Sequence, residues 1–259
     1  MRVDKTEFKT LFKLAIQAVF VQITLMSMTM IDIIMAGRHS EEAISAISLG
    51  TNILHPMTIV VYGLFCAVNP LAAELNGKKQ FTQLSQLALT AGYLALFLAP
   101  LYMLFLHYSQ FIIQFININE NLIPLVYDYL KSLSYGMPAF LLFLSLRFFN
   151  DGLFKSKNVL IATLLVAPVN VFFNWVWLYG KLGFPALGVA GLAYSTVVSW
   201  SLLALFMLFF TLRHQEVHFT SLKSCLPNLA IAKQLFKLGL PISGSIALEL
   251  FLLCLIGLL

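Results

Sequence analysis

Charged residues are scarce in this 259-residue chain, which is 10% Asp, Glu, Lys and Arg and 60% hydrophobic. A soluble domain carries about 25% charged residues and about 45–50% apolar ones. The chain therefore lacks the polar groups that would cover its surface in water, which excludes soluble enzymes, nucleic-acid-binding modules and disordered regulators. We expect no nucleic-acid partner, and the composition favours a lipid bilayer instead.

Cysteine is also rare. The three cysteines, Cys66, Cys225 and Cys254, are far apart and form no CxxC pair. Their spacing supports neither a disulfide framework nor a zinc or iron–sulfur site. The sequence contains no Walker loop, nucleophile elbow or HExxH helix, so we expect no enzyme activity and no catalytic residue.

Long hydrophobic runs dominate the sequence. Seven apolar stretches are separated by short polar segments, and they cover approximately residues 11–36, 47–71, 84–106, 131–149, 159–178, 188–212 and 238–259. About 20 apolar residues are enough for a helix to span a bilayer. The alternation typical of a membrane β-strand is absent. The sequence therefore predicts an all-α, polytopic membrane protein.

Basic residues are distributed unevenly between the two sides of these spans. Thirteen of the 16 Lys and Arg residues lie at the N-terminus or in the second, fourth and sixth connections, and the others are Arg38, Lys131 and Lys181. Because basic residues accumulate on the cytoplasmic side, the N-terminus is predicted to be cytoplasmic. Arg147 and Asp151, four residues apart at the inner end of the fourth span, are expected to form an interfacial ion pair.

A few polar residues lie inside the apolar stretches. Asp32 is about 6 Å from the outer end of the first span. It is either an interfacial carboxylate that reaches water or a cation or proton site in an outward cavity. Asn170 and Asn174 share one helix face, and Thr196 lies at a similar depth. Their oxygens suit a small cation or a proton relay, but they equally fit the polar contacts that hold membrane helices together.

Glu249 lies about 17 Å into the seventh apolar stretch, near the middle of the membrane. A carboxylate at that depth cannot reach water along its own side chain, so it needs a partner or a polar cavity. We interpret Glu249 as a functional residue.

A segment at the start of the chain recurs near its end. Residues 11–17 read LFKLAIQ and residues 235–241 read LFKLGLP, and both copies stand where a basic segment enters an apolar stretch. Such a match is either chance in an apolar chain or the start of a parallel internal repeat, an arrangement found in several transporter folds.

Taken in order, several motifs resemble the multidrug and toxic compound extrusion (MATE) family in its NorM-type bacterial branch. The motifs are Asp32–Gly37, Pro70–Glu74 with Asn76–Gly77, Arg147–Gly152, Asn170–Trp175, Tyr179–Gly180, Leu187–Gly191, Ser195–Thr196, and Leu238–Pro241 followed by Glu249. Each motif is weak alone, but the ordered set is specific. The resemblance extends over almost all of the chain.

The resemblance implies a secondary active multidrug efflux transporter. Family members are twelve-helix antiporters, and their two six-helix lobes enclose a central cavity. They export small cationic organic compounds in exchange for Na+ or H+, so the coupling ion takes the place of a cofactor. Asp32, Asn170, Asn174 and Thr196 match the family's cation or proton site, with Na+ at the first three. Glu249 matches the acidic residue of the seventh helix.

The resemblance also divides the chain. We expect a six-helix lobe over residues 1–212, a cytoplasmic linker over 213–237, and the first helix of an incomplete second lobe over 238–259. A full cavity would need the missing lobe or another chain, so we expect a truncated copy that is inactive by itself, in the bacterial inner membrane. The alternatives are a non-transporting remnant and a lipid or oligosaccharide flippase, for which we find no basic cavity residue at the midplane.

Overall fold

The structure is a computed structural model that describes residues 5–115, 119–214 and 228–258, with side chains described from 12–114, 119–214 and 228–249. Every regular element in these residues is a helix, which confirms the all-α prediction. The helices are α1 (Lys5–His39), α2 (Glu41–Cys66), α3 (Val68–Gly77), α4 (Phe81–His107), α5 (Gln110–Phe115), α6 (Ile123–Ser134), α7 (Met137–Gly152), α8 (Ser156–Tyr179), α9 (Val189–Leu212) and α10 (Leu229–Leu258).

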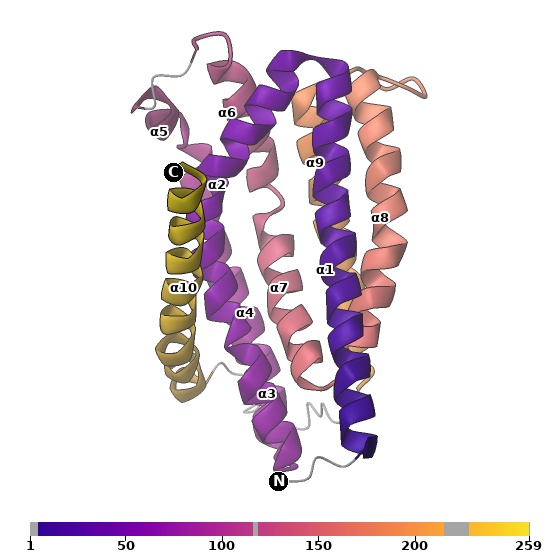
Figure 1. Cartoon of the computed structure of the whole chain (residues 1–259), viewed down its shortest axis with the longest axis vertical. Helices are drawn as coiled ribbons and strands as arrows, with labels where there is room; N and C mark the ends of the chain where they lie inside the picture. Colours follow the sequence, from indigo (N-terminus) through magenta and orange to yellow (C-terminus); the bar gives the residue numbers. More distant parts are fainter. Residues whose placement is uncertain (1–4, 116–118, 215–227, 259) are drawn as a thin grey trace.

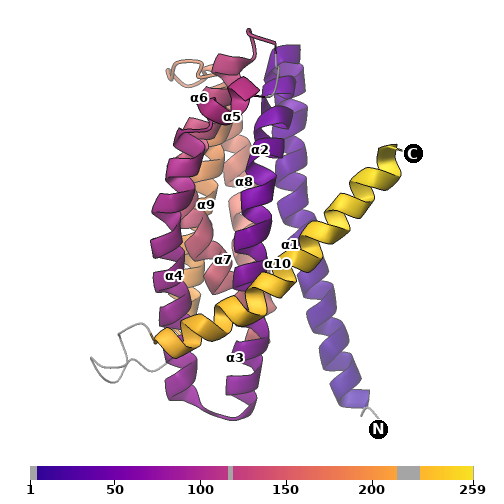
Figure 2. The same cartoon turned by 90° about the vertical axis from the view of Figure 1, so that its left-hand side faces the viewer.

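The long helices stand side by side in a bundle (Figure 1), and α10 crosses it obliquely (Figure 2). Helix α1 packs against α8 and α2, while α9 packs against α6, α7 and α8. Helix α10 lies on α2 and touches α4. Residues far apart in the sequence are thereby brought together along the middle of the bundle.

Among the described residues, five helical segments are long and apolar enough to cross a membrane, and a bent pair makes a sixth. The five are Phe12–His39, Glu41–Gly77, Phe81–Gln114, Ser156–Tyr179 and Val189–Leu212. The sixth joins α6 to α7 across a bend of 55°. These six spans correspond to the first six apolar stretches of the sequence, which confirms a polytopic helical bundle.

The fourth stretch, predicted as one helix over 131–149, is two helices. The break falls at Tyr135–Gly136, just before Met137 and Pro138. Proline has no backbone N–H and disfavours helical backbone in the residue before it, so α7 starts anew with Pro138 in its first turn. Gly136 fits here because a Cβ at that position would lie 2.9 Å from Trp200 and Val197 of α9.

Large apolar side chains cover the outer faces of the spans. On α1 and α4, Phe20, Met30, Phe97 and Leu101 are each more than half exposed. In water such a surface would be unstable, whereas in a bilayer it contacts acyl chains of similar polarity. The bundle interior holds small and aliphatic residues together with a few polar ones.

Helix α10 begins at Leu229, whereas the sequence was expected to enter the membrane at Leu238 after a linker over 213–237. Hydropathy locates the apolar run but not the helix, and Leu229–Lys237 are helix-compatible residues outside that run. Asn228 fixes the start of the helix. Its side-chain oxygen accepts from the backbone N–H of Ala230 at 2.9 Å, and its backbone N–H donates to Thr90 Oγ1 at 3.1 Å. The remainder of the expected linker, 215–227, lies outside the described residues.

The contact between α10 and α2 is made by small residues. Ser243 Oγ donates to Val60 O at 2.9 Å. A Cβ on Gly63 would lie 2.3 Å from Ser243 Oγ, and a Cβ on Gly239 would lie 2.6 Å from the backbone of Leu64. Glycine at both positions therefore lets the two helix backbones approach closely, as small residues commonly do between membrane helices.

Candidate functional site

Asp32 lies on α1 near its outer end and is half-buried. Its two carboxylate oxygens accept from different helices: Oδ1 from Asn174 Nδ2 at 2.5 Å, and Oδ2 from Thr196 Oγ1 at 3.4 Å. The carboxylate thus joins α1 to α8 and α9. No basic side chain forms an ion pair with it among the described residues.

Asn170 and Asn174 are almost completely buried, at 1% and 0% exposed. They lie one turn apart on α8, which turns both amides toward α1, and Asn174 Nδ2 also donates to Asn170 Oδ1 at 3.2 Å. The amide of Asn174 therefore bridges two oxygens, while its own Oδ1 is buried without a hydrogen-bond partner. A buried oxygen without a partner is uncommon and calls for a ligand or a functional explanation.

The structure brings Asp32, Asn170, Asn174 and Thr196 together, as the sequence predicted. Their oxygens are one carboxylate, two amide carbonyls and one hydroxyl, which are hard ligands suited to a small cation. Within the described residues, no three His, Cys, Asp or Glu side chains gather in a way that would hold a transition metal. The cluster therefore fits Na+ or a proton better than zinc or iron.

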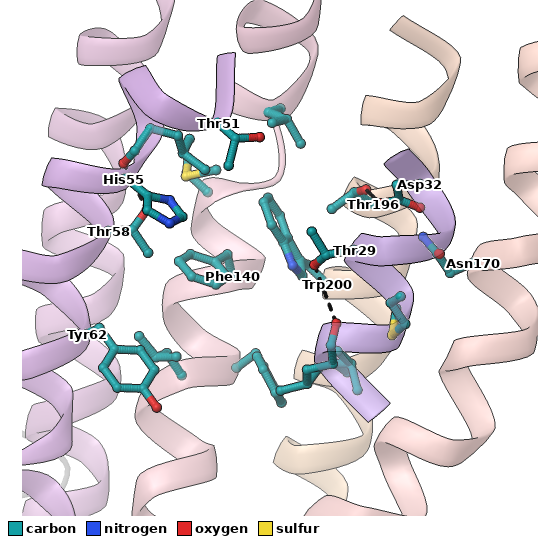
Figure 3. A pocket seen from close by; sticks show the side chains of 18 of the residues that line it. Thr29, Asp32, Thr51, His55, Thr58, Tyr62, Phe140, Asn170, Thr196 and Trp200 are labelled. Atoms are coloured by element: carbon teal, nitrogen blue, oxygen red, sulfur yellow. Dashed lines mark hydrogen bonds between the residues drawn. The ribbon is translucent and has the colours of Figure 1, made fainter. Parts of the chain in front are cut away.

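The cluster stands at the edge of a cavity of about 330 Å³. Figure 3 shows Asp32, Asn170 and Thr196 on one side, with the helix that carries His55, Thr58 and Tyr62 across from them. Apolar and aromatic side chains form most of the wall, including Phe140 of α7 and Trp200 of α9. Among the described lining residues Asp32 is the single carboxylate.

The wall formed by α2 contains polar residues that the sequence analysis did not assign to a site. Thr51, His55, Thr58 and Tyr62 line the cavity, and Thr58 Oγ1 shares a 2.6 Å hydrogen bond with Tyr102 OH. Their spacing of four, three and four residues places them on one face of a helix, and this periodicity is visible in the sequence. The stripe was not interpreted as a site because the second stretch contains no charged residue.

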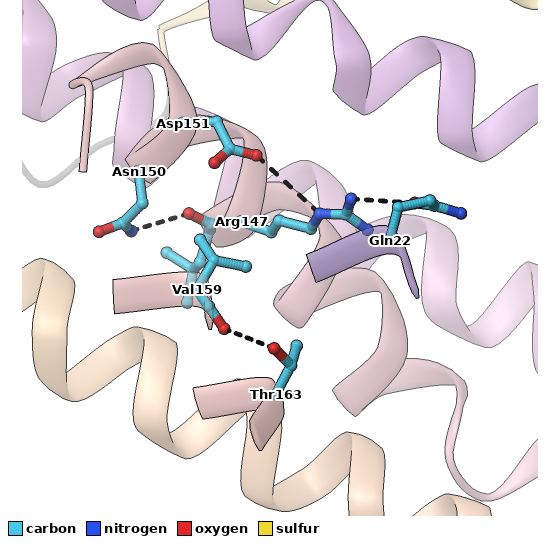
Figure 4. Close-up of polar contacts among 7 residues, drawn as sticks. Gln22, Arg147, Asn150, Asp151, Val159 and Thr163 are labelled. Atoms are coloured by element: carbon cyan, nitrogen blue, oxygen red, sulfur yellow. Dashed lines mark hydrogen bonds and ion pairs between the residues drawn. The ribbon is translucent and has the colours of Figure 1, made fainter. Parts of the chain in front are cut away.

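Arg147 also belongs to the cavity wall. It forms the predicted ion pair with Asp151, with Nε 3.9 Å from Oδ2, and the two side chains are 9% and 17% exposed. Arg147 is 8% exposed, lines the cavity, and reaches Gln22 in the middle of α1 (Figure 4). Position within the stretch suggested the helix end, whereas the packing of α7 against α1 and α2 encloses the side chain.

Glu249 is not brought to the cluster. It lies on an exposed face of α10 and does not line the cavity. The structure of the described residues therefore groups four of the five expected site residues and leaves the fifth apart.

The MatE family model matches residues 18–176, which is more than half of the chain. The chain belongs to this family. Across 98% of its length, the MatE chain is 35% identical to the "Probable multidrug resistance protein NorM" of Mannheimia succiniciproducens. It is 30% identical, also over 98% of its length, to the multidrug resistance protein MdtK of Pectobacterium atrosepticum. The resemblance to the NorM-type branch is thereby confirmed.

Solved structures of MATE transporters share the fold. A eukaryotic MATE transporter superposes with a TM-score of 0.83 at 18% identity, over 94% of this chain and 54% of that one. A MATE transporter in a bent conformation gives 0.81 at 20% identity, over 91% and 52%. The two curated relatives are each covered over 56% of their length, so the MatE chain spans about half the length of the relatives it matches.

Proposed function

We propose that this chain is the ion-coupling lobe of a secondary active exporter, which expels small cationic organic compounds in exchange for Na+ or H+. The observation that carries the proposal is Asp32, the single carboxylate among the described lining residues of the cavity. The names of the relatives, multidrug resistance proteins, support the same class of activity.

Asp32 needs a compensating positive charge. A carboxylate within a membrane span is costly, and neutral donors from Asn174 and Thr196 offset only part of that cost. A proton on the carboxylate or a Na+ ion among the clustered oxygens would remove the charge. The unpartnered Oδ1 of Asn174 supports the second arrangement, because rotation of this amide would present an oxygen to the ion.

A cationic substrate would compete for the same carboxylate. The cavity next to Asp32 is walled by Phe140 and Trp200 and adjoins Tyr62, and aromatic faces attract organic cations. If ion and drug cannot both neutralise Asp32, each lowers the affinity for the other by the same factor. This reciprocal exclusion is the thermodynamic requirement for antiport.

Transport needs a second half. We propose that a second six-helix lobe, or another chain, closes the cavity and allows it to face each side of the membrane in turn. Glu249, exposed on α10, is proposed to meet that second half rather than the Asp32 cluster. The excess of basic residues at the N-terminus and the even connections supports a cytoplasmic N-terminus in a bacterial inner membrane.

The proposal is tested by ethidium binding to the purified chain in detergent, measured by fluorescence. Asp32→Asn keeps the shape and removes the charge. Its amide oxygen can still accept from Asn174 Nδ2, while its amide nitrogen donates to Thr196 Oγ1 where the carboxylate accepted. An exposed or half-buried charge contact of this kind is worth about 1.5–3 kcal/mol, so we expect ethidium affinity to fall about tenfold or more. Na+ or acid should displace ethidium from the unmodified chain but not from the variant.

The matched control is Glu74→Gln, which removes an exposed carboxylate paired with Lys78 outside the cavity. It should leave ethidium affinity and its dependence on Na+ and pH unchanged. Equal ethidium affinity in Asp32→Asn and in the unmodified chain would contradict the proposed role of Asp32.

A further inference from the structure

A second hollow lies between α4, α7 and α9. Helices α4 and α9 each pack against α7 rather than against each other, which leaves a groove with α7 as its floor. The groove has a volume of about 270 Å³, and none of the described residues that line it also lines the cavity beside Asp32. Its lining includes two residues each of α4, α7 and α9: Ala88 and Gly92, Leu142 and Leu146, Leu208 and Leu212.

The groove is open and apolar. A Cβ on Gly92 would meet only Leu142 Cδ1, at 3.9 Å, so this glycine leaves space that no neighbouring helix fills. Thr211 also lines the groove, but its hydroxyl is 2% exposed and accepts from Asn150 Nδ2 at 2.8 Å. Its hydroxyl is therefore already used, and the groove suits a hydrocarbon chain.

The dimensions of the groove select a narrow occupant. Ala88 and Leu96 of α4 both line it and are eight residues apart, which is about 12 Å along the helix. A volume of about 270 Å³ over that length gives a slot about 5 Å across, whereas a helix is about 10–12 Å in diameter. The slot admits an acyl chain but not a helix, and its length fits within one leaflet of a hydrocarbon core about 30 Å thick.

A basic residue stands at one end of the groove. Leu212 is the last residue of α9, at the end of the bundle that we propose to be cytoplasmic, and Arg213 follows it directly. The Arg213 guanidinium is exposed and stacks on the ring of Phe209, with its carbon 4.2 Å from the ring centroid. Stacking leaves the N–H groups at the edge of the guanidinium plane able to donate. Among the described residues, no carboxylate forms an ion pair with Arg213.

We propose that this groove binds one acyl chain of an anionic phospholipid, whose phosphate accepts hydrogen bonds from the guanidinium of Arg213. The planar fork of arginine matches a phosphate in a bidentate arrangement, and basic sites between membrane helices attract anionic head groups. The lipid is distinct from any exported compound, because it stays bound on the outer surface of the bundle. Seated there, it contacts α4, α7 and α9 together and fills the space between the two walls.

The experiment counts bound lipids by native mass spectrometry of the purified chain. Phosphatidylglycerol and phosphatidylcholine with identical acyl chains are titrated separately, so that only the charge of the head group differs. One basic residue near a membrane surface contributes about 1 kcal/mol toward an anionic lipid, which corresponds to about fivefold in affinity. We therefore expect the first phosphatidylglycerol to bind about fivefold more tightly than the first phosphatidylcholine.

Two variants separate the chain-binding groove from the head-group site. Gly92→Leu places a side chain in the open groove, so the affinity for the first phosphatidylglycerol should fall at least fivefold. Arg213→Gln leaves the groove open, so phosphatidylglycerol should bind no more tightly than phosphatidylcholine. A thermal melt of each variant establishes that it is folded.

Each variant has a matched control outside the groove. Gly244→Leu makes the same substitution on α10, where a Cβ would meet nothing within 4 Å. Lys157→Gln removes an exposed basic residue near the same end of the bundle, at the start of α8. Both controls should bind the two lipids as the unmodified chain does.

The comparison of the two lipids on the unmodified chain needs no variant. Equal affinities would overturn the proposal and leave only general lipid contact. A preference for phosphatidylglycerol that persists in a folded Gly92→Leu or in a folded Arg213→Gln also overturns it. A dimer that Gly92→Leu dissociates would assign the groove to a second copy of the chain instead. Because no transported compound is present, these outcomes are independent of the proposed export activity.

Discussion

Sodium should stabilise the folded chain through the Asp32 cluster, and removal of its charge should abolish that effect. A ligand that binds only the folded state stabilises it by RT ln(1 + [L]/Kd), which is about 2.7 kcal/mol at a hundredfold excess over Kd. For a chain of this size each kcal/mol raises the melting temperature by about 2–4 °C. Saturating Na+ should therefore raise the melting temperature of the unmodified chain by about 5–10 °C.

Two substitutions separate the contribution of the Asp32 charge to this Na+-dependent shift from that of the neutral groups around it. Asp32→Asn removes the one formal charge of the cluster, so the Na+-dependent shift should disappear. Asn174→Ala removes one neutral oxygen and the amide that bridges Asp32 and Asn170. Loss of one supporting group typically weakens metal affinity about tenfold or more. At the same Na+ concentration about half of the shift, or less, should remain.

The assay is a melt followed by intrinsic fluorescence, since Trp200 lines the cavity and reports on its opening. Choline chloride replaces NaCl at constant ionic strength, so that general screening is equal in both samples. The same Na+ shift in Asp32→Asn as in the unmodified chain would refute the assignment. Absence of any Na+ shift in the unmodified chain would refute a sodium site and leave a proton as the coupling ion.

Two other perturbations test the packing that holds the site. Gly63→Leu places side-chain atoms where Ser243 now lies, so α10 should move away from α2 and a disulfide engineered between positions 60 and 243 should form more slowly. Asn150→Leu removes a fully buried amide that bonds Thr211 Oγ1 and His214 Nε2, each at 2.8 Å. It should lower stability by about 1–3 kcal/mol in a thermal melt, without changing the affinity of the folded chain for ethidium.

The spans and the Asp32 cluster were accessible from the sequence for physical reasons. Hydrocarbon excludes unpaired backbone groups, so an apolar run of about 20 residues has to be a helix. The depth of a residue then follows from the helical rise, which placed Asp32, Asn170, Asn174 and Thr196 in one layer. Spacing gave no more than a shared layer, because hydropathy carries no information on which helices are neighbours. The grouping of the four residues into one site came from the resemblance to the MATE family.

The features that the sequence did not predict correctly have physical reasons as well. The bend between α6 and α7 depends on Gly136 fitting against Trp200, which is a contact between distant segments. Helix α10 begins early because Asn228 bonds to Thr90 of α4. The enclosure of Arg147 by the neighbouring helices could not be read from its place near a helix end.

By itself the sequence determined that the protein lies in a bilayer, how many main spans it has and how deep its polar residues lie. Each of these follows from the cost of placing polar groups in hydrocarbon. The family membership of the chain rests on ordered motifs that were also visible in the sequence. Only the tertiary structure decided which residues face one cavity. It turned the amide of Asn174 onto Asp32, and it enclosed Arg147 opposite that carboxylate. Such pairings depend on the packing of helices that are distant in the chain.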